Sequence, residues 1–317
     1  MDSYTYLGPE GTFTELALLQ VPGAAQARRV PSNSAATALV MVRSGEVDAA
    51  MLPIENSIEG GVSATLDAIA TGQELRIIRE AIVPVSFVLA APVGVELSEV
   101  RRVGTHPHAW AQTRGWVEAN MNQAEYVPAT STAAAAHELL AESPAYQAAI
   151  CAKLVAERLG LQILAEKIED NAGAVTRFVL VSRPGPLPPA SGSDKTTVAV
   201  PLPEDRPGAL MEILDQFATR GVNLSRIESR PTGQFLGHYF FSIDAEGHLE
   251  DARVADALRA LHRISPQLRF IGSYPRADSQ YPLVPTHTTD RAFQEAQQWV
   301  ADLLGSRSER EQPEQGL

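Results

Sequence analysis

Short apolar runs alternate with helical patterns over the first 182 residues of the chain. Apolar runs bounded by turn residues predict strands, and apolar residues spaced three and four apart predict helices. The predicted strands are residues 4–8, 49–53, 77–90, 103–106, 125–128, 148–151 and 176–181. Alanine-rich helices are predicted between them, at residues 34–44, 108–121 and 131–141. Strands separated by helices indicate an α/β body built on parallel sheets, with helices on both faces.

The apolar stretch at residues 82–91 falls in the middle of its segment, and we expect the chain to cross there from one lobe to another. The predicted fold of residues 1–183 is therefore a two-lobed, periplasmic-binding-protein-like α/β body. Ligands of open α/β sheets bind at the carboxyl ends of the strands. A ligand site is therefore expected in the cleft between the lobes.

A stretch rich in proline and glycine divides the chain. Four prolines and two glycines fall within residues 183–194, which fits neither helix nor central strand, so residues 184–194 are predicted to form a semi-rigid linker. Residues 195–275 then follow the pattern of a ferredoxin-like βαββαβ domain. Its predicted elements are the strands 196–202, 222–229, 238–243 and 268–273 and the helices 207–220 and 251–264. Residues 276–317 are predicted to be a C-terminal extension, partly helical over 290–304 or disordered.

Composition and charge narrow the possible functions. The 317 residues are 44% hydrophobic and carry a formal net charge of −12. This acidity argues against nucleic acid and anionic membrane lipid as main partners, because both call for a concentrated basic surface. No metal site is expected, since Cys and His residues do not cluster at metal-ligand spacing, and the single cysteine, Cys151, forms no internal disulfide. Without a leader pattern or a membrane-spanning apolar run, we expect a cytoplasmic protein.

Two polar motifs follow predicted strands in the first half of this body. GPEGTF at residues 8–13 can hold a carboxylate with its backbone amides at a helix start, or can be a tight strand-to-helix turn. PIENSIEGG then offers a carboxylate, an amide and a hydroxyl in succession, from Glu55, Asn56 and Ser57. These three residues can bind a polar substrate, or can be solvated loop and capping residues.

Two further motifs lie in the second half. THPHAWAQ places His106 at a strand-to-helix junction, where a histidine can form hydrogen bonds or exchange a proton near neutral pH. NAGAVTRF ends in Thr176, Arg177 and Phe178. In a regular strand, the first and third of these share a face and Arg177 points the opposite way. Both polar groups therefore serve one ligand only if the strand begins irregularly or if the ligand lies across its end. Arg177 is either a surface charge or a carboxylate clamp.

Taken together, the motifs resemble those of the prephenate dehydratases. The resemblance runs through GPEGTFTE, LPIENSIEGG, THPHAWAQ and DNAGAVTRF, and continues after the linker into an ACT-type regulatory domain through DRPGAL and IESRP. It covers residues 4–275 in order. The family's histidine motif more often reads Ser-His-Pro-Gln, whereas Thr105 and His108 stand here. Because the chain begins directly on a predicted strand, we do not expect the helical chorismate mutase domain that some relatives carry at the amino end.

The resemblance implies a decarboxylating dehydration of prephenate to phenylpyruvate, on the way to phenylalanine. Aromatisation drives this reaction, so no metal or organic cofactor is expected. Thr176 is implied as the essential residue, a hydrogen-bond donor to the leaving oxygen, with Arg177 as a bidentate carboxylate clamp. The implied substrate-binding residues are Glu55, Asn56, Ser57, His106 and Phe178.

The ACT-type domain implies phenylalanine as an allosteric effector, bound between two such domains. The chain is therefore expected to form at least a dimer, a homodimer or homotetramer. The implied effector-binding residues are Gly208, Ala209, Leu210, Asn223, Glu228, Ser229, Arg230 and Pro231. Two alternatives stay open: a non-catalytic protein that senses amino acids, and a dehydratase that acts on arogenate, the amino analogue of prephenate.

Overall fold

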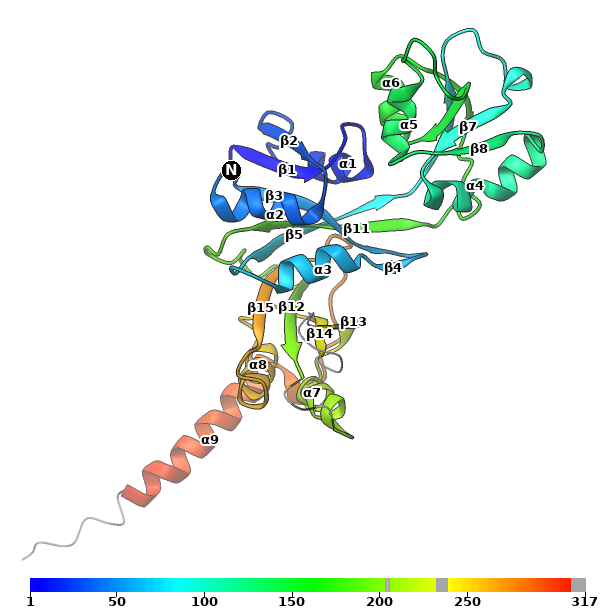
Figure 1. Cartoon of the computed structure of the whole chain (residues 1–317). Helices are drawn as coiled ribbons and strands as arrows, with labels where there is room; N and C mark the ends of the chain where they lie inside the picture. Colours follow the sequence, from blue (N-terminus) through cyan, green and yellow to red (C-terminus); the bar gives the residue numbers. More distant parts are fainter. Residues whose placement is uncertain (203, 205, 232–238, 309–317) are drawn as a thin grey trace, which may run out of the picture. The chain divides into compact units, whose positions relative to one another are not determined.

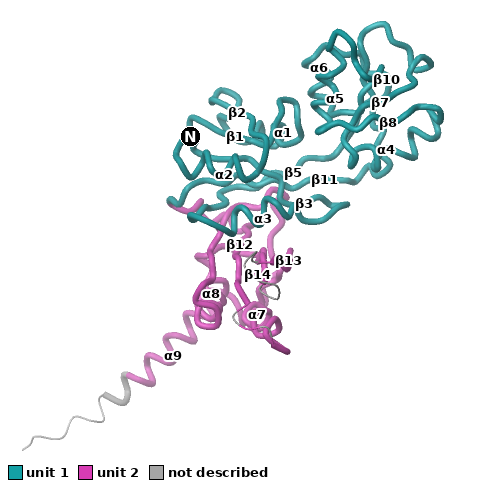
Figure 2. The backbone as a smooth tube through the Cα atoms, in the orientation of Figure 1, with its two compact units in different colours: residues 1–185 teal, residues 186–317 magenta. Residues whose placement is uncertain are grey.

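The computed structural model describes residues 1–202, 204, 206–231 and 239–308, with the side chains of residues 305–308 left aside. It divides into two compact units, Met1–Gly185 and Pro186–Leu317, which are coloured separately in Figure 2. We describe each unit by itself. The first unit consists of two lobes, each built on its own sheet.

The first lobe is a six-stranded sheet in the order β2-β1-β3-β11-β5, with β4 paired to β3. Its helices have well-defined ends: α2 begins after Ser34, whose side chain accepts a bond from the Thr37 amide, and ends at Gly45 in the left-handed conformation (φ 80°). A core between α1 and one sheet face includes Tyr6, Leu18 and Met51. The elements are β1 Ser3–Leu7, α1 Phe13–Leu19, β2 Arg28–Ser32, α2 Ala35–Ser44, β3 Ala49–Asn56, β4 Gly60–Gly61, α3 Ser63–Ala70, β5 Arg76–Pro84 and β11 Val175–Ser182.

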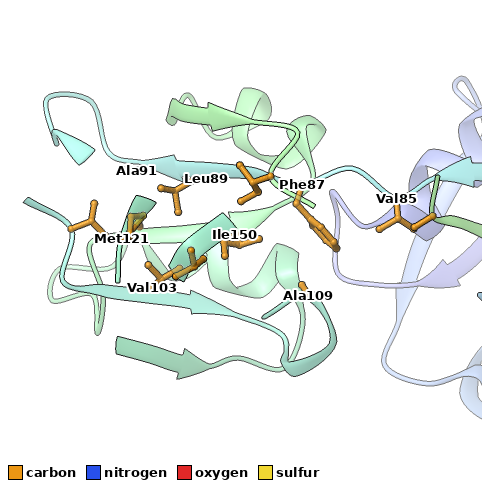
Figure 3. Close-up of a cluster of buried hydrophobic side chains, with 13 residues drawn as sticks. Val85, Phe87, Leu89, Ala91, Val103, Ala109, Met121 and Ile150 are labelled. Atoms are coloured by element: carbon orange, nitrogen blue, oxygen red, sulfur yellow. The ribbon is translucent and has the colours of Figure 1, made fainter. Parts of the chain in front are cut away.

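The second lobe is a five-stranded sheet in the order β10-β6-β9-β7-β8. Figure 3 shows apolar side chains of one of its cores, among them Leu89 and Ile150 from the strands and Ala109 from α4. Alanines of α5 pack in a second core with Val88 and Tyr146. The elements are β6 Val88–Ala91, η1 Leu97–Glu99, β7 Arg102–Thr105, α4 Pro107–Asn120, β8 Glu125–Pro128, α5 Thr132–Glu138, β9 Ala148–Cys151, α6 Lys153–Arg158 and β10 Gln162–Glu166.

The chain crosses between the lobes twice (Figure 1). It leaves after β5 and enters the second sheet at β6, which confirms the predicted crossing at residues 82–91. It returns after β10 and re-enters the first sheet as β11, a crossing that the sequence pattern did not reveal. Because β11 brings the chain back, it runs antiparallel to both β3 and β5. The prediction of parallel sheets was therefore only partly right, since each sheet combines parallel and antiparallel pairs.

The second unit carries the predicted βαββαβ domain, a four-stranded antiparallel sheet in the order β13-β14-β12-β15. Both helices lay an apolar face on this sheet, with Ile213 and Phe217 from α7 and Leu261 from α8 in one core. The elements are β12 Asp194–Pro201, α7 Ala209–Ala218, β13 Leu224–Pro231, β14 Tyr239–Glu246, α8 Ala252–Ile264 and β15 Arg269–Pro275. His238, the first residue of a predicted strand, lies outside the described residues.

The C-terminal extension contains a short turn of helix, η2 Thr286–Thr288, and the helix α9 Asp290–Ser308. Exposed apolar side chains of α9 include Trp299 and Leu303. Within the described ranges, no helix combines the length and apolar character that crossing a membrane requires.

Candidate functional site

Thr176 and Asn56 meet where β11 begins and β3 ends. The two residues are register partners in the antiparallel pairing of these strands. Nδ2 of Asn56 donates to Oγ1 of Thr176 at 2.9 Å. Thr176 is 9% exposed, so its hydroxyl lies just below the surface. The structure thus brings together two predicted site residues that are 120 positions apart in the sequence.

Ser57 forms hydrogen bonds with Val175 at the same strand end. Its backbone amide donates to the carbonyl oxygen of Val175 at 3.0 Å. Its Oγ accepts from the amide of Val175, also at 3.0 Å. Ser57 therefore fixes the residue that precedes Thr176, and its hydroxyl serves the backbone in this structure.

Arg177 is buried, at 6% exposure, and lies between two carboxylates. Its Nε donates to Oε2 of Glu80 at 2.6 Å, and its Nη1 lies 3.4 Å from Oε2 of Glu55. Glu80 is fully buried and Glu55 is 37% exposed at the side chain. The β3–β11 register shifts between Arg177 and Phe178, but it is regular over Thr176 and Arg177, which pair with Asn56 and Glu55. The carboxylate clamp stays a prediction, because protein carboxylates already neutralise this guanidinium.

Phe178 lies in the core of the first lobe. It is 2% exposed and packs in one cluster with Tyr4, Met51 and residues of α1. Its position gives it a packing role beneath the strand end. The contact of Phe178 with a substrate ring stays a prediction.

His106 is the N-cap of α4, and its Nδ1 accepts from the amide of His108 at 3.3 Å. Burial lowers the pKa of His106, and the ring of His108, 4.9 Å away between centroids, lowers it further. The lowered pKa favours the neutral form of the His106 ring near neutral pH.

His108, for which no site role was predicted, instead contacts the first lobe. Its Nδ1 lies 2.6 Å from Oε2 of Glu59, and Nε2 of Gln112 donates to Oε1 of the same glutamate at 3.3 Å. Glu59 follows the Asn56 strand end, whereas both partners belong to α4. The loop after β3 is thereby linked to the second lobe.

A cavity of about 210 Å³ lies at this junction of the lobes. The carbonyl side of the Gln112 amide, Oε1, is buried without a hydrogen-bond partner among the described residues. Asp170 fixes one wall, since its carboxylate accepts from the amides of Gly115 and Trp116 on α4. The cavity is lined by Ile58, Ala111, Gln112, Glu169, Asp170 and Asn171.

Sequence reasoning missed Glu59, Glu80 and Gln112 as residues of this region. Glu59 and Gln112 stand inside motifs that were already singled out, so proximity to those motifs was a usable signal. Glu80 lies in an apolar strand with no motif around it. An acidic residue in such a strand is itself unusual, because a buried carboxylate requires a partner.

The GPEGTF motif holds a carboxylate, but one that the protein supplies. The amide of Gly11 donates to Oε2 of Glu15 at 2.7 Å, and that oxygen also lies 2.7 Å from Nη1 of Arg158 in the second lobe. Gly11 has φ 84° and faces Val155, where a Cβ would stand 2.5 Å from the valine side chain. Of the two interpretations of this motif, the structure favours the tight turn, which here also links the two lobes, and not an open binding site for an anion.

The predicted effector residues form two groups in the second unit. Gly208 is the N-cap of α7 (φ 87°), followed by the buried Ala209 and the exposed Leu210. The other group lies on or just before β13, an edge strand of the sheet. Its members are Asn223, Glu228, Ser229, Arg230 and Pro231. A ligand between two copies stays a prediction.

In the part of the chain that the structure describes, no three Cys, His, Asp or Glu side chains form a group able to hold a metal ion. The fold and the motifs agree with comparisons to known proteins. A family model described as prephenate dehydratase matches residues 4–186, and an ACT domain model matches residues 200–263. The chain belongs to the prephenate dehydratase family.

Relatives in this family match the chain over nearly its whole length. The prephenate dehydratase of Mycobacteroides abscessus is 44% identical over 313 residues, which cover 97% of this chain and 99% of the relative. The crystal structure of the Arthrobacter aurescens prephenate dehydratase in complex with L-Phe is 67% identical, with a TM-score of 0.92, over 96% of this chain and 99% of that chain. A structure described as GqqA, a novel type of quorum quenching acylase, is 33% identical, with a TM-score of 0.75, over 86% and 97%.

Proposed function

We propose that this protein is a prephenate dehydratase, a carbon–oxygen lyase that converts prephenate to phenylpyruvate in phenylalanine biosynthesis. The observation that carries this proposal is the Thr176 hydroxyl, held by Asn56 at a strand end next to the junction of the lobes. Relatives of nearly full length bear the same name. The cytoplasmic location expected from the sequence accords with this role.

The reaction removes the ring hydroxyl of prephenate as hydroxide, which takes a proton from solvent to form water, and one carboxylate as carbon dioxide. The electrons of the breaking carbon–carbon bond complete the aromatic ring as the carbon–oxygen bond breaks. The departing oxygen gains negative charge, so a hydrogen-bond donor aimed at it lowers the barrier. Thr176 supplies this donor. Its hydroxyl is too weakly acidic to ionise, so it acts by hydrogen bonding.

Arg177 supports the site from below the strand end. Its guanidinium lies between the buried Glu80 and the half-exposed Glu55. It thereby positions Glu55 at the rim, and it offers the substrate a positive charge only if Glu55 moves away. We therefore retain Arg177 as a functional residue, with positioning as its first role and carboxylate binding as its second.

His106 and Ser57 complete the polar wall proposed for substrate binding. A neutral His106 donates one N–H without adding charge, which suits a hydroxyl or carboxylate oxygen. Ser57 contributes through the backbone of Val175, which it holds at 3.0 Å. The substrate is a dianion and the protein is acidic, so binding depends on such local donors.

The second unit is the proposed site of regulation. The similar Arthrobacter aurescens structure is described as a complex with L-Phe. We propose that phenylalanine binds to the ACT domain of this protein, between two copies, and inhibits the dehydratase. Inhibition at a second site requires two states with different affinities for the effector.

Turnover of prephenate tests the proposed function directly. The wild-type protein should form phenylpyruvate, measured by its absorbance, and phenylalanine should reduce the rate. Thr176→Val removes the hydroxyl at nearly constant volume and should lower kcat by about 100- to 1,000-fold. Thr176→Ser, which keeps a hydroxyl, should retain most of the activity. Equal rates for the valine variant and the wild type would contradict the proposed role.

The same assay separates the alternatives. A protein that only senses amino acids binds phenylalanine but forms no phenylpyruvate. An arogenate dehydratase converts arogenate faster than prephenate, so both substrates are compared at equal concentration. The acylase activity named for the 33% identical relative is tested by amide hydrolysis in a parallel reaction.

A further inference from the structure

The side-chain amide of Asn56 can take only one orientation in this structure. Its Oδ1 accepts from the backbone amide of Ile58 at 2.8 Å and from that of Glu59 at 3.2 Å. A flipped amide would place its NH₂ group against these two N–H donors, which neither side could satisfy. The oxygen of Asn56 is therefore committed to the turn that follows β3.

The nitrogen of Asn56 must then point at Thr176. Nδ2 donates to Oγ1 of Thr176 at 2.9 Å, so Oγ1 is the acceptor in this bond. A hydroxyl group has a single proton to donate. Because Asn56 occupies an acceptor position of Oγ1, that proton must be directed elsewhere. Across the described residues, no second hydrogen bond of Oγ1 accompanies this one.

We infer that Asn56 is a positioning residue that sets the polarity of the Thr176 hydroxyl and keeps its proton available for the departing oxygen of the substrate. This inference rests on the proposed function, and it explains why the Thr176 proton is available to the substrate. If residue 56 offered an acceptor instead, the hydroxyl would donate to the protein and would be lost to the reaction. The surrounding bonds support a fixed geometry, since Ser57 holds Val175 through two hydrogen bonds at 3.0 Å.

Two substitutions at position 56 distinguish a role in orienting the Thr176 hydroxyl from a purely structural role. Asn56→Asp keeps an oxygen for both backbone amides but presents a carboxylate to Thr176, which then accepts the hydroxyl proton. We expect kcat to fall by about 100-fold or more, the loss typical of a missing transition-state donor. Asn56→Ala loses the turn bonds as well but leaves the hydroxyl free to rotate, and should lose about 10-fold. A purely structural role predicts the opposite order, because aspartate preserves the turn.

Asn171→Asp is the matched control for the added charge. Asn171 lines the cavity at the junction of the lobes, and its Oδ1 also accepts a backbone amide, that of Gly173 at 3.0 Å. Charge repulsion of a dianionic substrate should raise KM in both aspartate variants, whereas only Asn56→Asp should lose most of its kcat. Circular dichroism and thermal unfolding establish that all variants are folded before their rates are compared.

The pH dependence of kcat provides a second readout that a structural role would not change. Below neutral pH, a growing fraction of the new carboxyl group in Asn56→Asp is protonated and again donates to Oγ1 of Thr176. Its kcat relative to wild type should therefore rise as the pH falls from 8 to 5, most steeply at the acid end, where the protonated fraction is largest. The Asn171→Asp variant should show no such recovery.

The outcomes are distinguishable. If the wild type forms no phenylpyruvate, the proposed function is overturned, and this inference with it. If the wild type turns over but Asn56→Asp is no slower than Asn56→Ala, or shows no recovery at low pH, the inference alone is overturned. The inference is supported if kcat of Asn56→Asp is low and recovers at low pH while kcat of Asn171→Asp is unaffected.

Discussion

The two units of this protein each contain a buried arginine held by one fully buried acid and one partly exposed acid. In the first unit, Arg177 lies between Glu80 (0% side-chain exposure) and Glu55 (37%). In the second unit, Arg226 lies between Asp244 (0%) and Glu228 (24%). Both clusters stand on antiparallel strands, yet they differ in geometry.

The Arg226 cluster is a closed network. Its Nε and Nη2 bind both oxygens of Asp244 at 3.0 and 2.9 Å, and Nη2 also donates to Ser242. The hydroxyl of Thr197 donates to the same aspartate at 2.8 Å. Planar, bidentate pairing of this kind gives strong, geometrically specific hydrogen bonds. This network has the form of a structural element.

The Arg177 cluster differs in its outer acid, since Glu55 is more exposed than Glu228. Nε of Arg177 donates to Glu80 at 2.6 Å, and the contact of Nη1 with Glu55 is long, at 3.4 Å. Glu55 directly precedes Asn56, which binds Thr176. Two similar sets of three charges thus differ in their neighbours: one lies within a hydrogen-bond network, and the other adjoins the hydroxyl for which we propose a catalytic role. The comparison shows that function follows from the neighbours of a charge cluster, not from its composition.

The largest effects should come from removing the fully buried acid of each cluster. Glu80→Ala and Asp244→Ala each leave a buried arginine without its main partner, which costs roughly 3–5 kcal/mol. Hydrogen–deuterium exchange should show faster exchange in the unit that carries the substitution. Only Glu80→Ala should also lower kcat, measured at a temperature where both variants are folded. A comparable kcat loss in Asp244→Ala would contradict a purely structural second cluster.

A smaller effect should follow from replacing each arginine with lysine. Lysine keeps the positive charge but lacks the planar guanidinium group with its several N–H donors. A lost hydrogen bond to a charged group costs about 1.5–3 kcal/mol. Arg226→Lys should lose stability without a change in kcat/KM. Arg177→Lys should in addition lower kcat/KM by about 10- to 100-fold, because Glu55 is no longer held at the rim. If both variants retained full kcat/KM, the Arg177 cluster would be structural as well.

The smallest effect concerns a third arginine cluster, at the end of β15. A hydrogen bond from Arg276 lowers the pKa of Asp278 from 3.8 to about 2. A lowered pKa in the folded state adds stability above the unfolded pKa, and this stability is lost as the pH falls from about 4 to about 2. Because Asp278 is 31% exposed, we expect a contribution below about 1 kcal/mol. Asp278→Asn should remove this part of the acid sensitivity in denaturant unfolding, and an unchanged pH profile would refute it.

The fold of this protein could be predicted from its sequence where the signals are local. The spacing of apolar residues along the sequence predicted α7 and α8. The alternation of these helices with strands predicted the βαββαβ order, which the structure confirms. The crossing at residues 82–91 was visible as an apolar run. The strand order and the direction of β11 were not predictable in this way, because they depend on the return crossing of the chain.

The sequence by itself determined the family, the two-lobed and βαββαβ architectures, and the candidate residues Thr176, Asn56 and Ser57. Only the tertiary structure decided what these residues contact: the Asn56 nitrogen at Thr176, 120 positions away, and Arg177 paired with Glu80, 97 positions away. The physical reason is the range of the interactions. Periodicity and turn chemistry act between neighbours in the chain, whereas hydrogen bonds and ion pairs form between whichever groups the packed strands bring within about 3 Å.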